Sequence, residues 1–230
     1  MIKDGDVMNG VDWLLLLVVL VANIVTTFAF LNEKVLKNIA QEQNSSSVNK
    51  VQVIYSVLFI LINIGISVLF LTLYQDNTIL FSLKRLLLLA ILWPIGYIDF
   101  KTYKIPNRFI LLGLIFRAFI LVFELFFERD LLVSNLISEG IAAGALVIAA
   151  LLCSLCIKNS IGYGDIKLFI VMGLMLGLEG IWSSIFVSLL VAFIVAVVLL
   201  ISRKKGKKDA IPFAPSIAIG TYISIIMTGM

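Results

Sequence analysis

The sequence predicts an all-α polytopic membrane protein with about eight transmembrane helices, and three observations support this fold class. The chain of 230 residues is 61% hydrophobic, far above the apolar share of an ordinary soluble domain. Several apolar runs reach the roughly 20 residues that a helix needs to cross a bilayer. The basic residues fall between these runs, which is the pattern of multi-pass membrane proteins. Because lipid offers the backbone no hydrogen-bond partners, each span is expected to be helical.

The apolar runs place eight spans along the chain, at residues 13–31, 51–73, 81–98, 109–127, 137–157, 166–178, 182–202 and 211–228. We interpret the first as a retained span, because no small-residue cleavage site of a signal peptide follows it. The sixth is short: about 13 residues form a helix of roughly 20 Å, which is less than the hydrocarbon core. Its start is therefore expected to lie in a wet cleft.

The loop charges predict the orientation in the membrane. Four loops hold 13 of the 18 Lys and Arg residues, namely 32–50, 99–108, 158–167 and 203–210. The positive-inside rule places these loops in the cytoplasm and both termini outside. The expected location is the inner (cytoplasmic) membrane, with lipid as a partner, and the basic run 203–209 anchors span seven on anionic headgroups.

The spans divide into two regions. Residues 1–80 form an N-terminal two-span region, whose polar segment 32–50 is expected to be a short cytoplasmic linker. Residues 81–230 form a six-span catalytic membrane domain. The net charge of +4 is explained by the membrane topology, and no nucleic-acid partner is expected.

The chain has no histidine, which excludes zinc proteases of the HExxH type and Ser-His or Cys-His hydrolases. Two aspartates remain as candidates, because Asp99 and Asp165 each lie next to an apolar span on the predicted cytoplasmic side. Ionisable groups at membrane depth are candidates for function. Two carboxylates that approach closely share a proton, so one can act as base on water and the other as acid. Gly162 and Gly164 would let an extended peptide come close.

Three segments of the sequence carry a family resemblance. Asp99 is followed by Ile105-Pro106-Asn107, then by Gly162-Tyr163-Gly164-Asp165 with Lys167, and then by Pro212-Phe213-Ala214-Pro215. In this order they resemble the type IV prepilin peptidase family of GxGD membrane aspartyl proteases, across about residues 90–222. Ala214 stands where the family usually has glycine.

The resemblance implies an aspartic endopeptidase with Asp99 and Asp165 as the catalytic pair. Such an enzyme would remove the basic leader peptide of a prepilin or pseudopilin precursor after a glycine, at the cytoplasmic face, as part of type IV pilus assembly or secretion. The residues that would bind substrate or shape the site are Gly162, Gly164, Lys167, Pro106, Asn107, Pro212, Phe213 and Pro215. No cofactor is expected for cleavage, and S-adenosylmethionine for methyl transfer is not readable from the sequence. Segment 32–50 contains no cysteine, so the zinc motif of many bacterial members is not expected and no metal site is predicted.

Other functions stay open from the residues alone. Each aspartate could be only a helix cap. A proton- or cation-coupled carrier could use Asp99 and Asp165 as ion sites, and an inactive relative could act as a scaffold. The sequence leaves the oligomeric state open.

Four further patterns yield smaller predictions. Arg117 and Glu124 share one helix face and are expected to form ion pairs inside the bundle. The lysines beside the aspartates, Lys101, Lys104 and Lys167, are expected to be interface anchors or cations acting on one carboxylate. Gly140 and Gly144 predict a close helix contact, while Cys153 and Cys156 are expected to be small packing residues.

Overall fold

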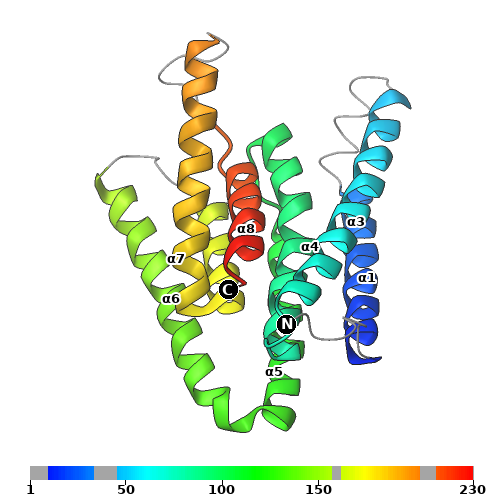
Figure 1. Cartoon of the computed structure of the whole chain (residues 1–230). Coiled ribbons are helices and arrows are strands. Elements are labelled where there is room, and N and C mark those ends of the chain that lie inside the picture. The colour runs from blue at the N-terminus through cyan, green and yellow to red at the C-terminus, as the bar shows by residue number, and fades with distance from the viewer. Residues whose placement is uncertain (1–9, 34–45, 157–161, 203–210, 230) are drawn as a thin grey trace, which may run out of the picture.

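Every element of the computed structural model is an α-helix in the described residues, which are 10–33, 46–156, 162–202 and 211–229 (Figure 1). This confirms the all-α fold class. The helices are α1 (Gly10–Leu31), α3 (Ser46–Leu73), α4 (Ile79–Thr102), α5 (Asn107–Phe127), α6 (Arg129–Cys156), α7 (Tyr163–Ile201) and α8 (Ala214–Thr228). Six of them, all except α8, are long and apolar enough to cross a membrane. The chain is therefore a multi-pass membrane protein.

Spans six and seven of the prediction are joined in the single 39-residue helix α7. Gly177 interrupts it with φ 67° and ψ −174°, a conformation open to glycine because it has no Cβ. The chain reverses there, so α7 consists of two arms that run in opposite directions (Figure 1). Ser138 of α6 accepts a hydrogen bond from the N–H of Leu178 at 2.9 Å, which satisfies a donor at the break. The eighth predicted span is the short helix α8, of 15 residues.

Several helices extend beyond the apolar runs that predicted them. Helix α4 continues to Thr102, α6 begins at Arg129, and α3 begins at Ser46 inside the predicted linker 32–50. Hydropathy marks only the part of a helix that lies in hydrocarbon, whereas the helix itself continues through polar residues in the headgroup region. The rest of that linker, residues 34–45, and the basic run 203–209 lie outside the described residues.

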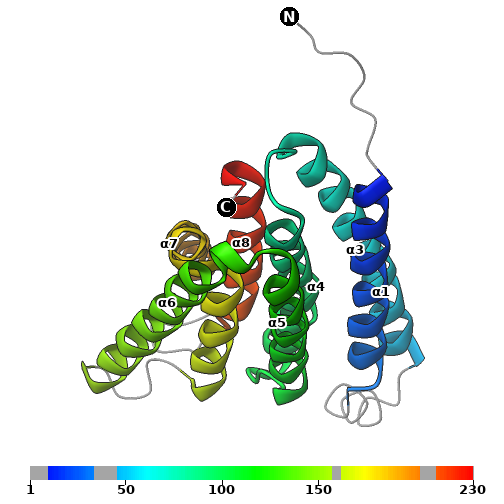
Figure 2. The same cartoon turned by 90° about the horizontal axis from the view of Figure 1, so that it is seen from below.

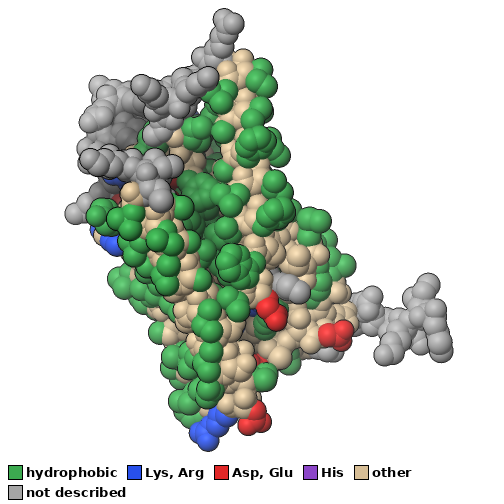
Figure 3. Space-filling view, turned by 90° about the vertical axis from the view of Figure 1, so that its left-hand side faces the viewer, with side chains coloured by type: hydrophobic (Ala, Val, Ile, Leu, Met, Phe, Trp, Pro, Cys, Tyr) green, Lys and Arg blue, Asp and Glu red, His purple; other side chains and the backbone are tan. Residues whose placement is uncertain are grey.

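Helix α4 lies at the centre of the bundle and is buried along most of its length. Seen from below, α1 and α3 cover one side of α4, while α5 and α8 lie beside it on the other and α8 separates it from part of α7 (Figure 2). The surface is rich in exposed apolar side chains (Figure 3), such as Trp13, Phe126 and Leu155 at 62%, 67% and 80% exposure. Such a surface suits lipid as its surroundings.

One end of the bundle holds the helix ends next to the four basic loops. The C-termini of α1, α4, α6 and α7 lie there with the N-termini of α3, α5, α7 and α8 (Figure 1). This arrangement agrees with the prediction that the four basic loops lie on the same side of the membrane. It also brings the three sequence segments that contain the candidate site to the same end.

The predicted close contact at Gly140 and Gly144 is wrong. A Cβ built on either glycine would meet nothing within 4 Å, so both face away from other helices. The close approach to α6 comes from α7: a Cβ on Gly173 would lie 2.6 Å from the backbone of Ala143. The small-residue pattern thus correctly predicted that α6 makes a close helix contact, but it predicted the wrong face of α6.

Gly173→Ala is expected to destabilise the protein by about 1–3 kcal/mol, because two helix backbones must separate to admit the methyl group. The matched variant Gly144→Ala has open space and is expected to leave stability unchanged or raise it slightly, by up to about 1 kcal/mol. The midpoints of thermal unfolding of both variants in detergent check this prediction. Equal midpoints would contradict it.

Candidate functional site

Asp99 lies in the last turn of α4, which ends at Tyr103 in the left-handed conformation with φ 54°. The side chain is buried, with 6% of the residue exposed. Its Oδ2 accepts a hydrogen bond of 3.1 Å from the N–H of Ala214, and the N–H of Phe213 also acts on the carboxylate. Asp99 therefore lies against the first turn of α8, where free N–H groups and the helix dipole favour a negative charge.

Asp165 lies in the first turn of α7 and is partly buried. Its Oδ2 accepts a hydrogen bond of 3.2 Å from the N–H of Gly162, the residue that precedes the helix. The capping interaction weighed from the sequence is thus present. A cap does not exclude chemistry, since a carboxylate can cap a helix with one oxygen and still react through the other.

The two aspartates come from helices 66 residues apart in the sequence, and the fold brings them together. The charge of Asp99 acts on Asp165 across the space between α4 and α7. Both carboxylates are at least partly withdrawn from solvent. Partly shielded carboxylates whose charges interact are the kind of groups that acid–base chemistry uses.

The Ile105-Pro106-Asn107 segment packs against the start of α7. Lys167 donates a hydrogen bond of 2.9 Å from Nζ to Oδ1 of Asn107, which links α7 to the first residue of α5. A Cβ on Gly164 would lie 3.0 Å from the Cβ of Ile105, so glycine allows this close approach. Pro106 precedes α5 in an extended conformation (φ −71°, ψ 131°) and thereby sets the direction of the connection.

The segment from Pro212 to Pro215 forms the start of α8. Phe213 precedes the helix and contacts Phe169 of α7 edge-on, with ring centroids 6.2 Å apart. Pro215 lies in the first turn, where a missing N–H costs no helical hydrogen bond. The fold therefore joins all three sequence segments: Asp99 of the first contacts Ala214 of the third, and Lys167 of the second contacts Asn107 of the first.

Gly96 is a site-shaping residue that the sequence analysis missed. A Cβ at this position would lie 3.4 Å from the Cα of Pro215 and 3.5 Å from the Cβ of Ala218. Gly96 precedes Asp99 by one helical turn, so it lets the start of α8 approach the carboxylate. The sequence signal that could have identified Gly96 is its position: it is a lone glycine within a run of bulky residues, one helical turn before an aspartate.

The lysines next to the aspartates form no ion pair with them in the part of the chain that the structure describes. Lys101 and Lys104 are exposed, and Lys167 binds Asn107. The alternative in which one of them acts on a carboxylate at ion-pair distance is therefore wrong for this conformation. Cys153 is an unpaired, exposed residue on α6, so it is not the packing residue that we predicted, and the side chain of Cys156 lies outside the described residues.

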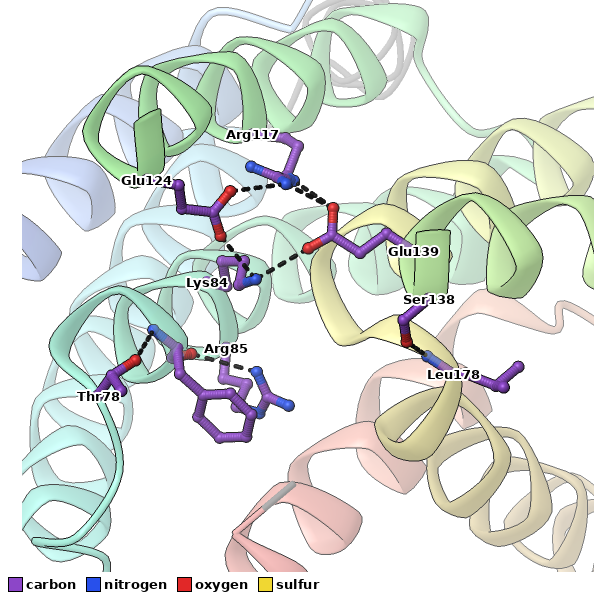
Figure 4. Close-up of polar contacts among 9 residues, drawn as sticks. Thr78, Lys84, Arg85, Arg117, Glu124, Ser138, Glu139 and Leu178 are labelled. Carbon is purple, nitrogen blue, oxygen red and sulfur yellow. Dashed lines mark hydrogen bonds and ion pairs between the residues drawn. The ribbon is translucent and has the colours of Figure 1, made fainter. Parts of the chain in front are cut away.

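The predicted ion pairing of Arg117 and Glu124 is confirmed, and two partners that the sequence did not reveal complete it. Lys84 of α4 contacts Glu124 at 2.9 Å and Glu139 at 2.8 Å, while Arg117 contacts both glutamates (Figure 4). The side chain of Lys84 is 7% exposed inside the bundle. We call these four residues the buried ion cluster.

A second polar network joins the N-terminal helices to the rest of the bundle. Asn63 of α3 donates to Oδ1 of Asn23 in α1 at 2.8 Å. The hydroxyl of Tyr222 in α8 donates to Oδ1 of Asn63. It also lies 3.1 Å from the carbonyl oxygen of Leu89 in α4. This network connects the two-span region to the helix whose start binds Asp99.

The fold and the site together define a multi-pass helical membrane protein with two interacting aspartates at one end of its bundle. A sequence profile of the type IV leader peptidase family matches residues 86–201. That range is half of the chain and includes both aspartates, and the chain belongs to this family.

A curated relative supports the same assignment. The chain is 28% identical over 138 residues to a protein of Bacillus subtilis (strain 168) named prepilin leader peptidase/N-methyltransferase. The match covers 60% of the chain and 53% of that protein, so the chain spans about half the length of the relative. No solved structure matches the chain.

Proposed function

We propose that this protein is a membrane aspartic endopeptidase that uses Asp99 and Asp165 as its catalytic pair. The observation that carries the proposal is that both side chains lie at one end of the bundle, where the charge of Asp99 acts on Asp165, although they come from helices distant in sequence. Membership of the leader peptidase family supports proteolysis as the chemistry. The absence of histidine leaves carboxylates as the natural acid–base groups.

In the proposed reaction, the ionised carboxylate takes a proton from water, whose oxygen attacks the scissile carbonyl carbon. The protonated carboxylate gives its proton to the carbonyl oxygen, which yields a neutral tetrahedral intermediate. Collapse of this intermediate breaks the C–N bond, and the amine leaves with a proton from the carboxylate that had received one. One hydroxyl of the intermediate gives its proton to the other carboxylate, which restores the starting state of the pair. The pair titrates as one unit, so neither residue is assigned alone as base or acid.

The proposed substrate is a prepilin or pseudopilin precursor, cut after a glycine at the end of its basic leader. The printed name of the Bacillus subtilis relative supports this substrate class. The basic loops at the aspartate end support the cytoplasmic face as the side of cleavage, by the positive-inside rule. In this orientation the protein lies in the inner membrane with both termini outside.

Eight residues are proposed to position the pair or the peptide: Gly162, Gly164, Lys167, Pro106, Asn107, Pro212, Phe213 and Pro215. Their contacts support positioning more than direct chemistry, since Gly162 holds Asp165 and Phe213 lies beside Asp99. Gly164 and the Lys167–Asn107 hydrogen bond fix the start of α7 against the loop before α5.

The test is the intact mass of a candidate prepilin after incubation with the purified protein in detergent, with and without S-adenosylmethionine. Loss of the leader up to its glycine is the expected result, and cleavage is expected to need no added cofactor. A further methyl mass that depends on S-adenosylmethionine would assign the methyl transfer named in the relative. Unchanged masses across several pilin-like precursors, with folded protein, would refute the peptidase and favour the carrier.

Replacing Gly96 tests the contact that supports the pair. Gly96→Ala adds one methyl group at ordinary contact distance, and cleavage is expected to stay within about threefold of the wild type, a change of roughly 0.7 kcal/mol. Gly96→Leu would push the start of α8 away from Asp99, and cleavage is expected to fall at least about 100-fold, since misplacements of 1 Å have such effects. Rates of leader release for both variants measure this. A fully active Gly96→Leu would show that the α8 contact is dispensable.

A further inference from the structure

A small polar cavity lies at the end of the bundle opposite the aspartates. Its volume is about 180 Å³, and it is lined by residues of α4, α6 and the turn of α7 at Gly177. The polar side chains that line it are Lys84, Arg85, Ser134, Asn135, Ser138, Glu139 and Glu179. Neither the proposed proteolysis nor the family assignment gives this cavity a role.

Arg85 is the unusual residue of this cavity, because it is a buried cation with no ion-pair partner. Only 2% of the residue is exposed. Its Nη1 donates to the carbonyl of Phe81 at 3.2 Å, and the guanidinium lies over the Phe81 ring (Figure 4). Within the described ranges, Nε has no hydrogen-bond partner and no carboxylate lies at ion-pair distance.

The neighbouring charges do not neutralise Arg85. Glu124 and Glu139 each contact both Lys84 and Arg117, so their charges are already balanced inside the buried ion cluster. Glu139 and the exposed Glu179 both act on Arg85, but neither lies at ion-pair distance from it. A buried charge without a partner is costly, and buried charges are normally paired. The cavity lining contains two cations and two carboxylates, and Arg85 is the cation among them that no ion pair occupies within the described residues.

We propose that this cavity binds a phosphate group, with Arg85 as the charge partner. Arg forms paired hydrogen bonds with phosphate oxygens through its planar guanidinium. Ser134 and Asn135 offer further donors, and Ser138 keeps its hydroxyl hydrogen because its oxygen accepts from Leu178. The phosphate comes from a phospholipid headgroup or from free inorganic phosphate.

The position of Arg85 along its helix suits a lipid headgroup. Arg85 is six residues after Ile79, the first residue of α4, which is roughly 9 Å along the axis at 1.5 Å per residue. The cavity thus lies near the end of the bundle, where the headgroup region of the bilayer is expected. Anionic lipid bound here would hold α4, α6 and the Gly177 turn of α7 together.

The experiment measures thermal unfolding of the full-length protein, delipidated in a neutral maltoside detergent. Phosphatidylglycerol is expected to raise the midpoint by about 5 °C at saturation, and diacylglycerol, which lacks phosphate, is expected to leave it unchanged. An equal rise with inorganic phosphate assigns a free oxyanion as ligand, whereas a rise with phosphatidylglycerol alone assigns the lipid. No rise with either compound overturns the proposal.

Two variants separate the site from general charge effects. Arg85→Gln is expected to lose the rise, while Arg129→Gln, which removes an exposed cation at the same end, is expected to keep it. If Arg85→Gln does not fold, Asn135→Ala should raise the ligand concentration for half-maximal effect at least about threefold, roughly 0.7 kcal/mol.

Glu179→Gln tests the competing explanation, in which Glu179 itself is the partner of Arg85. The phosphate proposal predicts that this variant keeps the full rise with phosphatidylglycerol. The proposal is overturned if Arg85→Gln responds as the wild type does, or if Glu179→Gln abolishes the response.

Discussion

Replacing either Asp99 or Asp165 by asparagine is expected to lower the rate of leader cleavage at least about 1,000-fold, because general acid–base catalysis contributes about 10²–10⁴ in rate and one carboxylate cannot perform both steps. Asparagine keeps the shape of the side chain and can still accept the N–H of Ala214 or Gly162. The fold is therefore expected to remain. The measurement is single-turnover release of the leader, with unfolding midpoints to verify that each variant is folded.

A matched control comes from an aspartate outside the site. Asp76 is exposed in the turn between α3 and α4, and Asp76→Asn removes the same charge without touching the pair. It is expected to cleave at the wild-type rate. The double variant Asp99→Asn/Asp165→Asn is expected to be no slower than either single variant, since the two residues act as one unit. Cleavage by a folded double variant would refute the proposed mechanism.

The candidate site could be predicted from the sequence because each of its parts lies beside an apolar span. Hydropathy and loop charge placed Asp99 and Asp165 on the same side of the membrane, but these patterns do not show whether the two side chains lie close together. The structure agrees, since the charges of the two residues interact. Their catalytic roles remain a prediction, which the variants above test.

The features that the sequence did not predict all depend on which helix faces which. A hydrophobic span has apolar residues on every side, so its pattern does not show the buried face. For this reason Gly140 and Gly144 were placed in a contact that Gly173 makes instead. The reversal at Gly177 was read as a boundary between two spans, because composition does not distinguish a loop from a sharp turn inside one helix.

The buried ion cluster shows the same limitation for charged residues. Arg117 and Glu124 were recognised because their charges stand out within a span, but Lys84 and Glu139 lie close to the starts of the predicted spans 81–98 and 137–157, where charged residues are ordinary. Only the packing of α4, α5 and α6 shows that all four side chains are buried. We therefore expect a substitution in this cluster to cause the largest loss of stability in the described part of the molecule.

Glu139→Gln is expected to destabilise the protein by about 3–5 kcal/mol, because removing one partner of a buried ion pair leaves an uncompensated charge. Glu139 contacts both cations of the cluster, so Lys84 and Arg117 would be left with Glu124 alone. The measurement is the unfolding midpoint in detergent. Glu128→Gln is the matched control, since Glu128 ends α5 at the same end of the bundle and is only partly buried.

A double variant distinguishes loss of a charge partner from simple loss of packing. Arg117→Leu/Glu139→Leu removes one cation and one anion and leaves Lys84 paired with Glu124. Replacing a buried ion pair by apolar residues is often neutral or stabilising, so this variant is expected to be more stable than Glu139→Gln. If it is instead less stable, the shape of the cluster matters more than its charge balance. In that case the four side chains act mainly as packing between α4, α5 and α6.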